Sequence, residues 1–294
     1  MGILLGLATA FCWGSADLFA RFLTRRLGTF RTMLFMQMCG FCLLTLAIGR
    51  LGGWGHLFDG SGSGPWAWGV AAGLLNTIST LALYRSFEIG KLSIVAPISA
   101  SYPVLTMVLG AFTGERLTPM RLAGSLLAIS GVVLVARGEH VEQDANPPDE
   151  ATPSAKSRQG AEWALLSAVG FGVMFWLLGL RVVPMLGSAP SVWLIRLASV
   201  LATAAAMVTF GQSMAVPAGR DAPLIFGVGL LDTSAYVFNN FGMMREQTSV
   251  VSVLASLYGA VTVGLAAMFL RERVSPAQWV GIAAIFVGIV LISR

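Results

Sequence analysis

The end of the chain reads SVVSVLASLYGAVTVGLAAMFLRERVSPAQWVGIAAIFVGIVLISR (residues 249–294), and residues 93–137 carry an earlier copy, SIVAPISASYPVLTMVLGAFTGERLTPMRLAGSLLAISGVVLVAR. The matched pairs include Ser93/Ser249, Tyr102/Tyr258 and Thr106/Thr262, and, after a one-residue insertion in the later copy, Pro119/Pro276, Gly124/Gly281 and Gly131/Gly288. Each copy predicts two apolar helices joined by a Glu-Arg-x-[Ser/Thr]-Pro turn, at 115–119 and 272–276. The repeat therefore predicts a chain of two similar halves.

The composition indicates an integral membrane protein. Hydrophobic residues make up 56% of the chain and charged residues only 11%. A soluble domain carries about 25% charged residues, because its surface must face water. The net charge of +5 suits basic loop ends against anionic lipid, and no basic run interleaved with aromatics suggests nucleic-acid binding.

Ten stretches are long and apolar enough to predict membrane-spanning helices, each needing about 20 residues. They cover residues 2–20, 32–48, 66–84, 92–112, 120–136, 161–180, 191–210, 223–244, 249–270 and 276–293. Residues 138–160 are polar and rich in acidic residues and proline, which predicts a flexible linker between a first half, 1–137, and a second half, 161–294.

Five helices per half is an odd number, so two copies in one chain must insert in opposite orientations. The predicted fold is an all-α membrane protein whose ten helices form two five-helix inverted repeats around a central cavity. The positive-inside rule, applied to the loop charges, predicts both termini outside the cell.

Polar residues inside the spans predict that cavity. Asn76, Ser79 and Thr80 share a face of the third span, and Asp232, Tyr236 and Asn239 share the matching face of the eighth. A polar face on a spanning helix must look at protein or at a water-filled cavity. A set of interhelical hydrogen bonds without a ligand is the structural alternative. Deep aromatic residues could line a pocket for apolar solutes: Trp13, Trp176, Tyr102, Tyr236 and Tyr258.

Three charged residues lie within spans. Asp17 has Arg21 one helical turn later, which favours an ordinary ion pair near the helix end. Arg196 and Asp232 lie in adjacent spans and could pair with each other. Alternatively, Asp232 couples protons, or Arg196 holds a substrate carboxylate while Asp232 holds its ammonium.

Prolines interrupt the fourth span at Pro97 and Pro103, which predicts a kink or hinge there. Gly259, at the position of Pro103 in the later copy, could give the ninth span a similar weak point.

Motifs for other chemistry are missing from the sequence. Cys39 and Cys42 form a C-x-x-C without a second ligand pair, so we predict neither a metal site nor a cofactor. No metalloprotease, hydrolase or nucleotide-binding motif occurs, so we do not expect an enzyme.

These features resemble the drug/metabolite transporter superfamily, EamA type. The resemblance is carried by the ten spans, by Trp13-Gly14 in the first helix, and by the Glu-Arg-x-[Ser/Thr]-Pro turn in each half. Within the superfamily, the chain is most similar to bacterial exporters of aromatic amino acids, of the YddG kind. The resemblance implies a ten-helix basket with alternating access and termini in the cytoplasm, although the loop charges predict termini outside.

The expected function is export of small amphipathic metabolites, above all aromatic and other neutral amino acids, by a monomer in the bacterial inner membrane. The expected partners are a small-molecule substrate and the lipid bilayer. The candidate substrate-binding residues are Trp13, Asn76, Ser79, Thr80, Tyr102, Arg196, Asp232, Tyr236, Asn239 and Tyr258. The alternatives are a membrane scaffold or complex subunit without transport, and a passive facilitator of another metabolite class.

Overall fold

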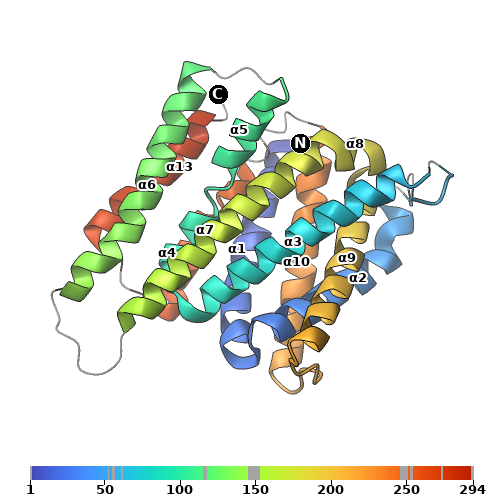
Figure 1. The fold of residues 1–294 in the computed structure, drawn as a ribbon, viewed down its shortest axis with the longest axis horizontal. Helices are drawn as coiled ribbons and strands as arrows, with labels where there is room; N and C mark the ends of the chain where they lie inside the picture. Colours follow the sequence, from blue (N-terminus) through green and yellow to red (C-terminus); the bar gives the residue numbers. More distant parts are fainter. Residues whose placement is uncertain are drawn as a thin grey trace.

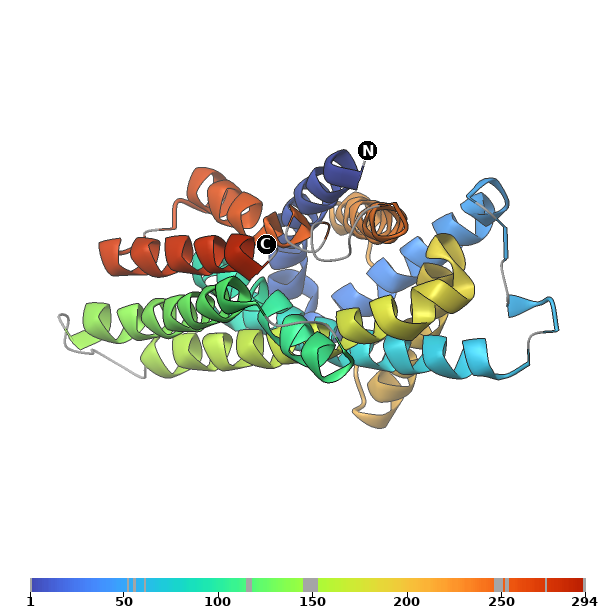
Figure 2. The ribbon, with the colours of Figure 1, turned by 90° about the horizontal axis from the view of Figure 1, so that it is seen from above.

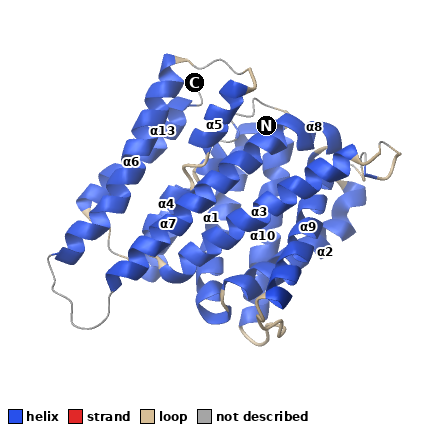
Figure 3. Cartoon of the chain, in the orientation of Figure 1, coloured by secondary structure: helices blue, strands red, loops and turns tan. Residues whose placement is uncertain are grey.

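The computed structural model describes residues 2–51, 53–54, 57–60, 62–114, 118–144, 153–245, 251, 254–272 and 274–292. These residues form helices and connecting loops, and no strand occurs among them (Figure 3). Grouped by where the chain reverses direction, the helices make ten segments, as the sequence predicts (Figure 1).

The first half contains five of the segments. They are α1 (Gly2–Leu27), α2 (Thr29–Ala47) with the short η1 (Ile48–Arg50), α3 (Gly64–Ile89), the pair α4 (Leu92–Ser99) and α5 (Pro103–Phe112), and α6 (Pro119–Asp144).

The second half repeats the order. Its segments are α7 (Pro153–Leu177) with the π-helical η3 (Leu178–Val182) and α8 (Val183–Leu186), α9 (Ser188–Thr209), α10 (Asp221–Met243), α12 (Tyr258–Leu265) with the π-helical η4 (Ala266–Leu270), and α13 (Pro276–Ile292).

The predicted linker, 138–160, is shorter than expected in the described part of the chain. Helix α6 continues to Asp144 and α7 begins at Pro153. The remaining linker positions, 145–152, lie outside the described residues, so the domain boundaries stay a prediction.

A single glycine joins the first two segments of each half. Gly28 separates α1 from α2 with φ of 83°, and Gly187 separates α8 from α9 with φ of 80°. Residues with a Cβ rarely adopt this left-handed region, so glycine allows the chain to reverse in one step. The two halves therefore use the same joint at the same place.

The packing between the halves is symmetric. Helix α1 packs on α10, and its counterpart α7 packs on α3. Likewise α2 contacts both α9 and α10, while α9 contacts both α2 and α3. Exchanging the two halves leaves this set of contacts unchanged, as expected for a pseudo-twofold axis.

The contact between α6 and α13 fixes the direction of that axis. A methyl group added to Gly131 would lie 2.5 Å from the Gly281 carbonyl oxygen, and one added to Gly288 would lie 2.5 Å from that of Gly124. The two helices therefore cross in close contact and run antiparallel (Figures 1 and 2). Since α6 and α13 are repeat equivalents, the halves are inverted relative to one another.

Several segments can cross a bilayer. By length and composition, five described helices qualify, covering 29–50, 64–89, 92–112, 159–186 and 188–209. Shorter apolar helices cover 119–134, 254–270 and 276–291. Large apolar side chains such as Leu126, Leu201 and Val280 are exposed on the outside of the bundle, where lipid would cover them. The chain is a multi-pass membrane protein.

The fourth segment is broken near its middle. Helix α4 contains Pro97 and ends at Ser99, and α5 begins at Pro103. The ninth segment has a turn at Leu257, directly before α12, which contains Gly259. Both breaks fall beside the repeated tyrosines, so the two fourth helices of the halves are interrupted at equivalent positions. Whether the breaks act as hinges stays a prediction.

Candidate functional site

A cavity lies where the two halves meet. Its volume is about 40 Å³, room for on the order of three water molecules. Six residues predicted from the sequence line it: Trp13, Thr80, Tyr102, Asp232, Tyr236 and Tyr258. They come from α1, α3, α10, α12 and the break between α4 and α5. Both halves therefore contribute walls to one polar and aromatic cavity.

The remaining lining residues were not among the predicted site residues. They are Ala16, Asp17, Leu83, Tyr84, Phe171 and Phe175. Phe171 and Phe175 lie on α7, the repeat equivalent of α1. The faint match of residues 168–172 to residues 10–14 puts Phe171 at the position of Trp13, which is the signal that could have identified it.

Aromatic rings form most of the wall. The ring of Trp13 meets Tyr236, Phe175 and Tyr258 edge-on, with centroid separations of 5.1, 5.8 and 5.9 Å. Tyr102 stacks on Phe175 at 4.7 Å. These separations are typical of favourable aromatic pairs, so the rings hold one another in place and present π-faces and edges to the cavity.

Arg196 and Asp232 form an ion pair at one side of the cavity. Nη2 of Arg196 lies 2.5 Å from Oδ2 of Asp232, and Nη1 donates to Oε1 of Gln37. The guanidinium carbon lies 5.0 Å from the centroid of the Tyr236 ring, a cation–π distance. Arg196 is fully buried and does not line the cavity, whereas Asp232 does. The geometry thus favours the structural pair over a clamp in which Arg196 faces a substrate.

Asn76 lies directly behind the cavity wall. Its Oδ1 accepts a hydrogen bond from the Tyr236 hydroxyl at 2.7 Å, and its Nδ2 donates to Oγ of Ser199 at 3.1 Å. Asn76 is fully buried, so its role is to orient Tyr236 across the interface between the halves.

Two predicted site residues lie away from the cavity. Ser79 donates to the Leu75 carbonyl and packs against Gly170 of α7. Asn239 is fully buried next to Asn240 and Met243. The structure therefore brings together most, but not all, of the predicted polar residues.

Asp17 has a different environment from the one predicted. Its carboxylate lines the cavity and lies 3.1 Å from Oγ1 of Thr262. Arg21 points away from it, with Nη2 3.6 Å from Oε1 of Glu272 and Nη1 donating to the Phe87 carbonyl. The predicted Asp17–Arg21 pair is therefore wrong, because partners from elsewhere in the fold bind each residue.

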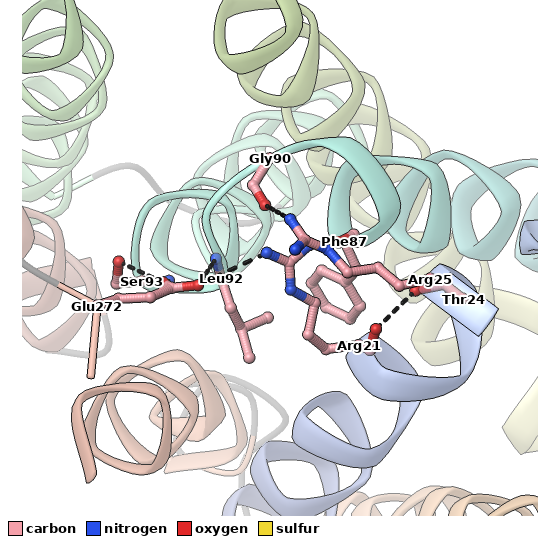
Figure 4. A network of polar contacts seen from close by, with 8 residues as sticks. All are labelled: Arg21, Thr24, Arg25, Phe87, Gly90, Leu92, Ser93 and Glu272. Atoms are coloured by element: carbon pink, nitrogen blue, oxygen red, sulfur yellow. Dashed lines mark hydrogen bonds and ion pairs between the residues drawn. The ribbon is translucent and has the colours of Figure 1, made fainter. Parts of the chain in front are cut away.

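Glu272 links the start of α4 to Arg21 of α1 (Figure 4). This residue belongs to the second repeated Glu-Arg turn, and its carboxylate accepts hydrogen bonds from the backbone N–H groups of Leu92 and Ser93 and from the Ser93 hydroxyl. A carboxylate at the start of α4 satisfies otherwise free donors and the positive end of the helix dipole. The first copy, with Glu115, and its expected partner Ser249 lie outside the described residues.

The comparison with family profiles gives one match over most of the chain. The EamA-like transporter family matches residues 1–137 and 158–294.

Among the described residues, no group of three or more His, Cys, Asp or Glu side chains could hold a metal ion.

The chain is also similar to an uncharacterized transporter and to a solved structure. An uncharacterized transporter from Archaeoglobus fulgidus is 40% identical over 76 residues, which are 26% of this chain and 28% of the relative. The match thus spans well under two thirds of that protein. A solved crystal structure covers 99% of this chain and 95% of its own, with a TM-score of 0.69 at 18% identity. At that identity the likeness concerns the fold alone.

Proposed function

Since the chain belongs to the EamA-like transporter family, we propose that it is a secondary transporter that exports small amphipathic metabolites across the bacterial inner membrane. Aromatic and other neutral amino acids are the first substrates to test. The central cavity is the proposed substrate site. The observation that carries this proposal is a polar and aromatic cavity whose walls come from both halves.

The proposed mechanism is alternating access by rocking of the inverted halves. A cavity of about 40 Å³ is too small for an amino acid, so a substrate enters only when helices separate. The pseudo-twofold packing supplies two ways to separate, related by rotation about the axis, one toward each side of the membrane. In this proposal the breaks at Pro97, Pro103 and Gly259 are the hinges.

A scaffold or complex subunit without transport predicts close-packed side chains at mid-depth. The cavity between Trp13, Asp17 and Tyr258 supports transport instead. An imposed pH gradient across a liposome membrane distinguishes a coupled exporter from a passive facilitator, because only the coupled exporter changes its net flux.

Trp13→Ala tests the proposed site. Trp13 is 8% exposed and contacts three other aromatic rings, so its removal opens the substrate site without touching the buried ion pair. We expect flux of labelled tryptophan or phenylalanine in proteoliposomes to fall to the level of empty liposomes. Trp279→Ala, at a tryptophan that is 48% exposed on α13, is the matched control and should keep wild-type flux. Wild-type flux in Trp13→Ala would contradict the proposed site.

A further inference from the structure

The head group that the cavity accepts can be inferred from its charges. Asp17 is 6% exposed, and its side chain reaches the cavity from α1. The one polar contact described for its carboxylate is with the Thr262 hydroxyl. That hydroxyl also lies 2.9 Å from the Tyr258 carbonyl, and its single proton cannot serve both acceptors fully. Asp17 is thus a buried carboxylate with weak protein compensation.

Cationic side chains do not line the cavity in the described part of the chain. The Arg196 guanidinium binds Asp232 and Gln37 behind the residues that line the cavity. Arg21, one helical turn from Asp17, is drawn toward Glu272 and the Phe87 carbonyl. Asp232 is neutralised by Arg196, so the cavity presents an excess of one negative charge when Asp17 is ionised.

The aromatic rings complete a site for a cation. Trp13 and Tyr258 lie on either side of the helix interface next to Asp17, with ring centroids 5.9 Å apart. The quadrupole of such rings attracts ammonium groups, and the attraction grows in a desolvated site. A carboxylate together with several aromatic faces is therefore complementary to a charged amine on an apolar body.

We propose that the cavity selects amphipathic amines with a net positive charge, and that Asp17 binds their ammonium group. This inference rests on the proposed transport function, and it puts cationic amines in place of neutral amino acids as the leading substrates. An amino acid zwitterion would satisfy Asp17 with its ammonium, but its carboxylate would have no cationic partner in the cavity and would lie near Asp17 and Asp232. Leaving that charge unpaired in a buried site is costly. An amine without a carboxylate avoids this cost.

Three ligands with one indole ring test the head group: tryptamine, tryptophan and indole-3-propionate. Their binding to the purified protein in detergent is measured by calorimetry at neutral pH. We expect tryptamine to bind about 10- to 100-fold more tightly than tryptophan, the range that corresponds to the cost of leaving one buried charged group, here the carboxylate of tryptophan, without a partner. Indole-3-propionate should bind most weakly. Equal or tighter binding of tryptophan would overturn the inference.

Variants assign the selection to Asp17. Asp17→Asn should remove the preference for tryptamine, and Asp17→Glu should restore part of it. Asp221→Asn, at a carboxylate that pairs with Arg26 on the surface of the bundle, is the matched control and should keep it. Retained selectivity in a folded Asp17→Asn protein would overturn the inference. If Asp17→Asn does not fold, Thr262→Val takes its place, because it removes the hydroxyl contact of the carboxylate and leaves the ammonium group as its partner. A larger preference for tryptamine then supports the inference, and an unchanged or smaller preference overturns it.

Transport and binding can fail separately. Counterflow of trimethylated tryptamine, whose charge is permanent and prevents leakage through the lipid, measures transport in proteoliposomes. Selective binding without counterflow would contradict the proposed transport function and leave the head-group inference intact. Counterflow of tryptophan in preference to the amine would contradict the inference and support the transport function.

Discussion

Arg196 is a residue at which the two halves differ in charge. Gly73 of α3 packs against Ile195 and Ala198 of α9. Its repeat equivalent Gly229 packs against Met36 and Cys39 of α2 in the same way. This register puts Gln37 at the position that Arg196 has in the second half. The repeat already puts Asn76 at the position of Asp232, so one half has two amide side chains at the positions where the other has an ion pair.

This equivalence gives a prediction for the buried pair. Asp232→Asn leaves a fully buried guanidinium without its carboxylate, and we expect the free energy of unfolding to fall by about 3 to 5 kcal/mol. Arg196→Gln combined with Asp232→Asn reproduces the neutral groups of the first half and should recover most of that loss. Thermal unfolding of the purified variants measures both changes. A double variant less stable than Asp232→Asn would contradict the pairing.

At single positions, the sequence predicted best where a residue's face followed from its own helix. Thr80, Tyr236 and Asp232 were predicted to line the cavity, and they do. Ser79 directly precedes Thr80, but one residue turns a helical side chain by about 100°, and Ser79 faces α7 instead. The sequence predicts an ion pair between Asp17 and Arg21 because spacing along one helix is all that the sequence shows of the surroundings of Asp17. Its partner Thr262 is 245 residues away along the chain.

Among the helices, the α6–α13 crossing depends on glycines that are matched between the repeats. Gly131→Ala adds a methyl group 2.5 Å from a backbone carbonyl oxygen of the other helix. That oxygen cannot move by itself, so the two helices must move apart to make room for the methyl group. We expect a destabilisation of about 1 to 3 kcal/mol. Gly264→Ala on α12 meets no atom within 4 Å, and the gain in helix propensity should stabilise it by up to about 1 kcal/mol. We therefore predict that Gly131→Ala lowers the thermal unfolding temperature and that Gly264→Ala raises it. Equal shifts for the two variants would contradict the close crossing of α6 and α13.

The start of α4 provides a second prediction for the helices. Glu272→Gln removes the carboxylate that accepts from Leu92 and Ser93 and leaves Arg21, which is 5% exposed, without its anion. We expect a loss of about 1 to 3 kcal/mol in the free energy of unfolding. Asp221→Asn breaks a more exposed pair with Arg26 and should cost less than about 1 kcal/mol. Similar thermal shifts for the two variants would argue against the cap.

The order and number of helices could be predicted because long apolar stretches and a repeated turn are visible in the sequence. The interruption near Pro103 was also predictable from the proline itself. The cap formed by Glu272 was not, since it joins the turn before α13 to the start of α4 across the two halves. Contacts between distant segments depend on the assembled fold, and the sequence of either segment carries no sign of them.

On the scale of the whole molecule, the antiparallel crossing of α6 and α13 shows that the two halves are inverted relative to one another. The proposed transport depends on a second property, the opening of the cavity between the halves. Both ends of the chain lie at the same edge of the bundle in Figure 1, as ten crossings require. The cavity has room for only a few water molecules. A transporter must therefore populate other conformations, in which this cavity reaches each side of the membrane in turn.

Accessibility of one cavity residue tests this account most directly. In a protein with Cys12, Cys39 and Cys42 replaced by alanine, Thr80→Cys is labelled with a membrane-impermeant maleimide from either side of oriented vesicles. Ser79→Cys, one position away but facing α7, is the matched control. We predict that Thr80→Cys is labelled from both sides, that a bound substrate slows the labelling, and that Ser79→Cys is not labelled. Absence of labelling at Thr80→Cys from both sides would contradict a cavity that opens alternately.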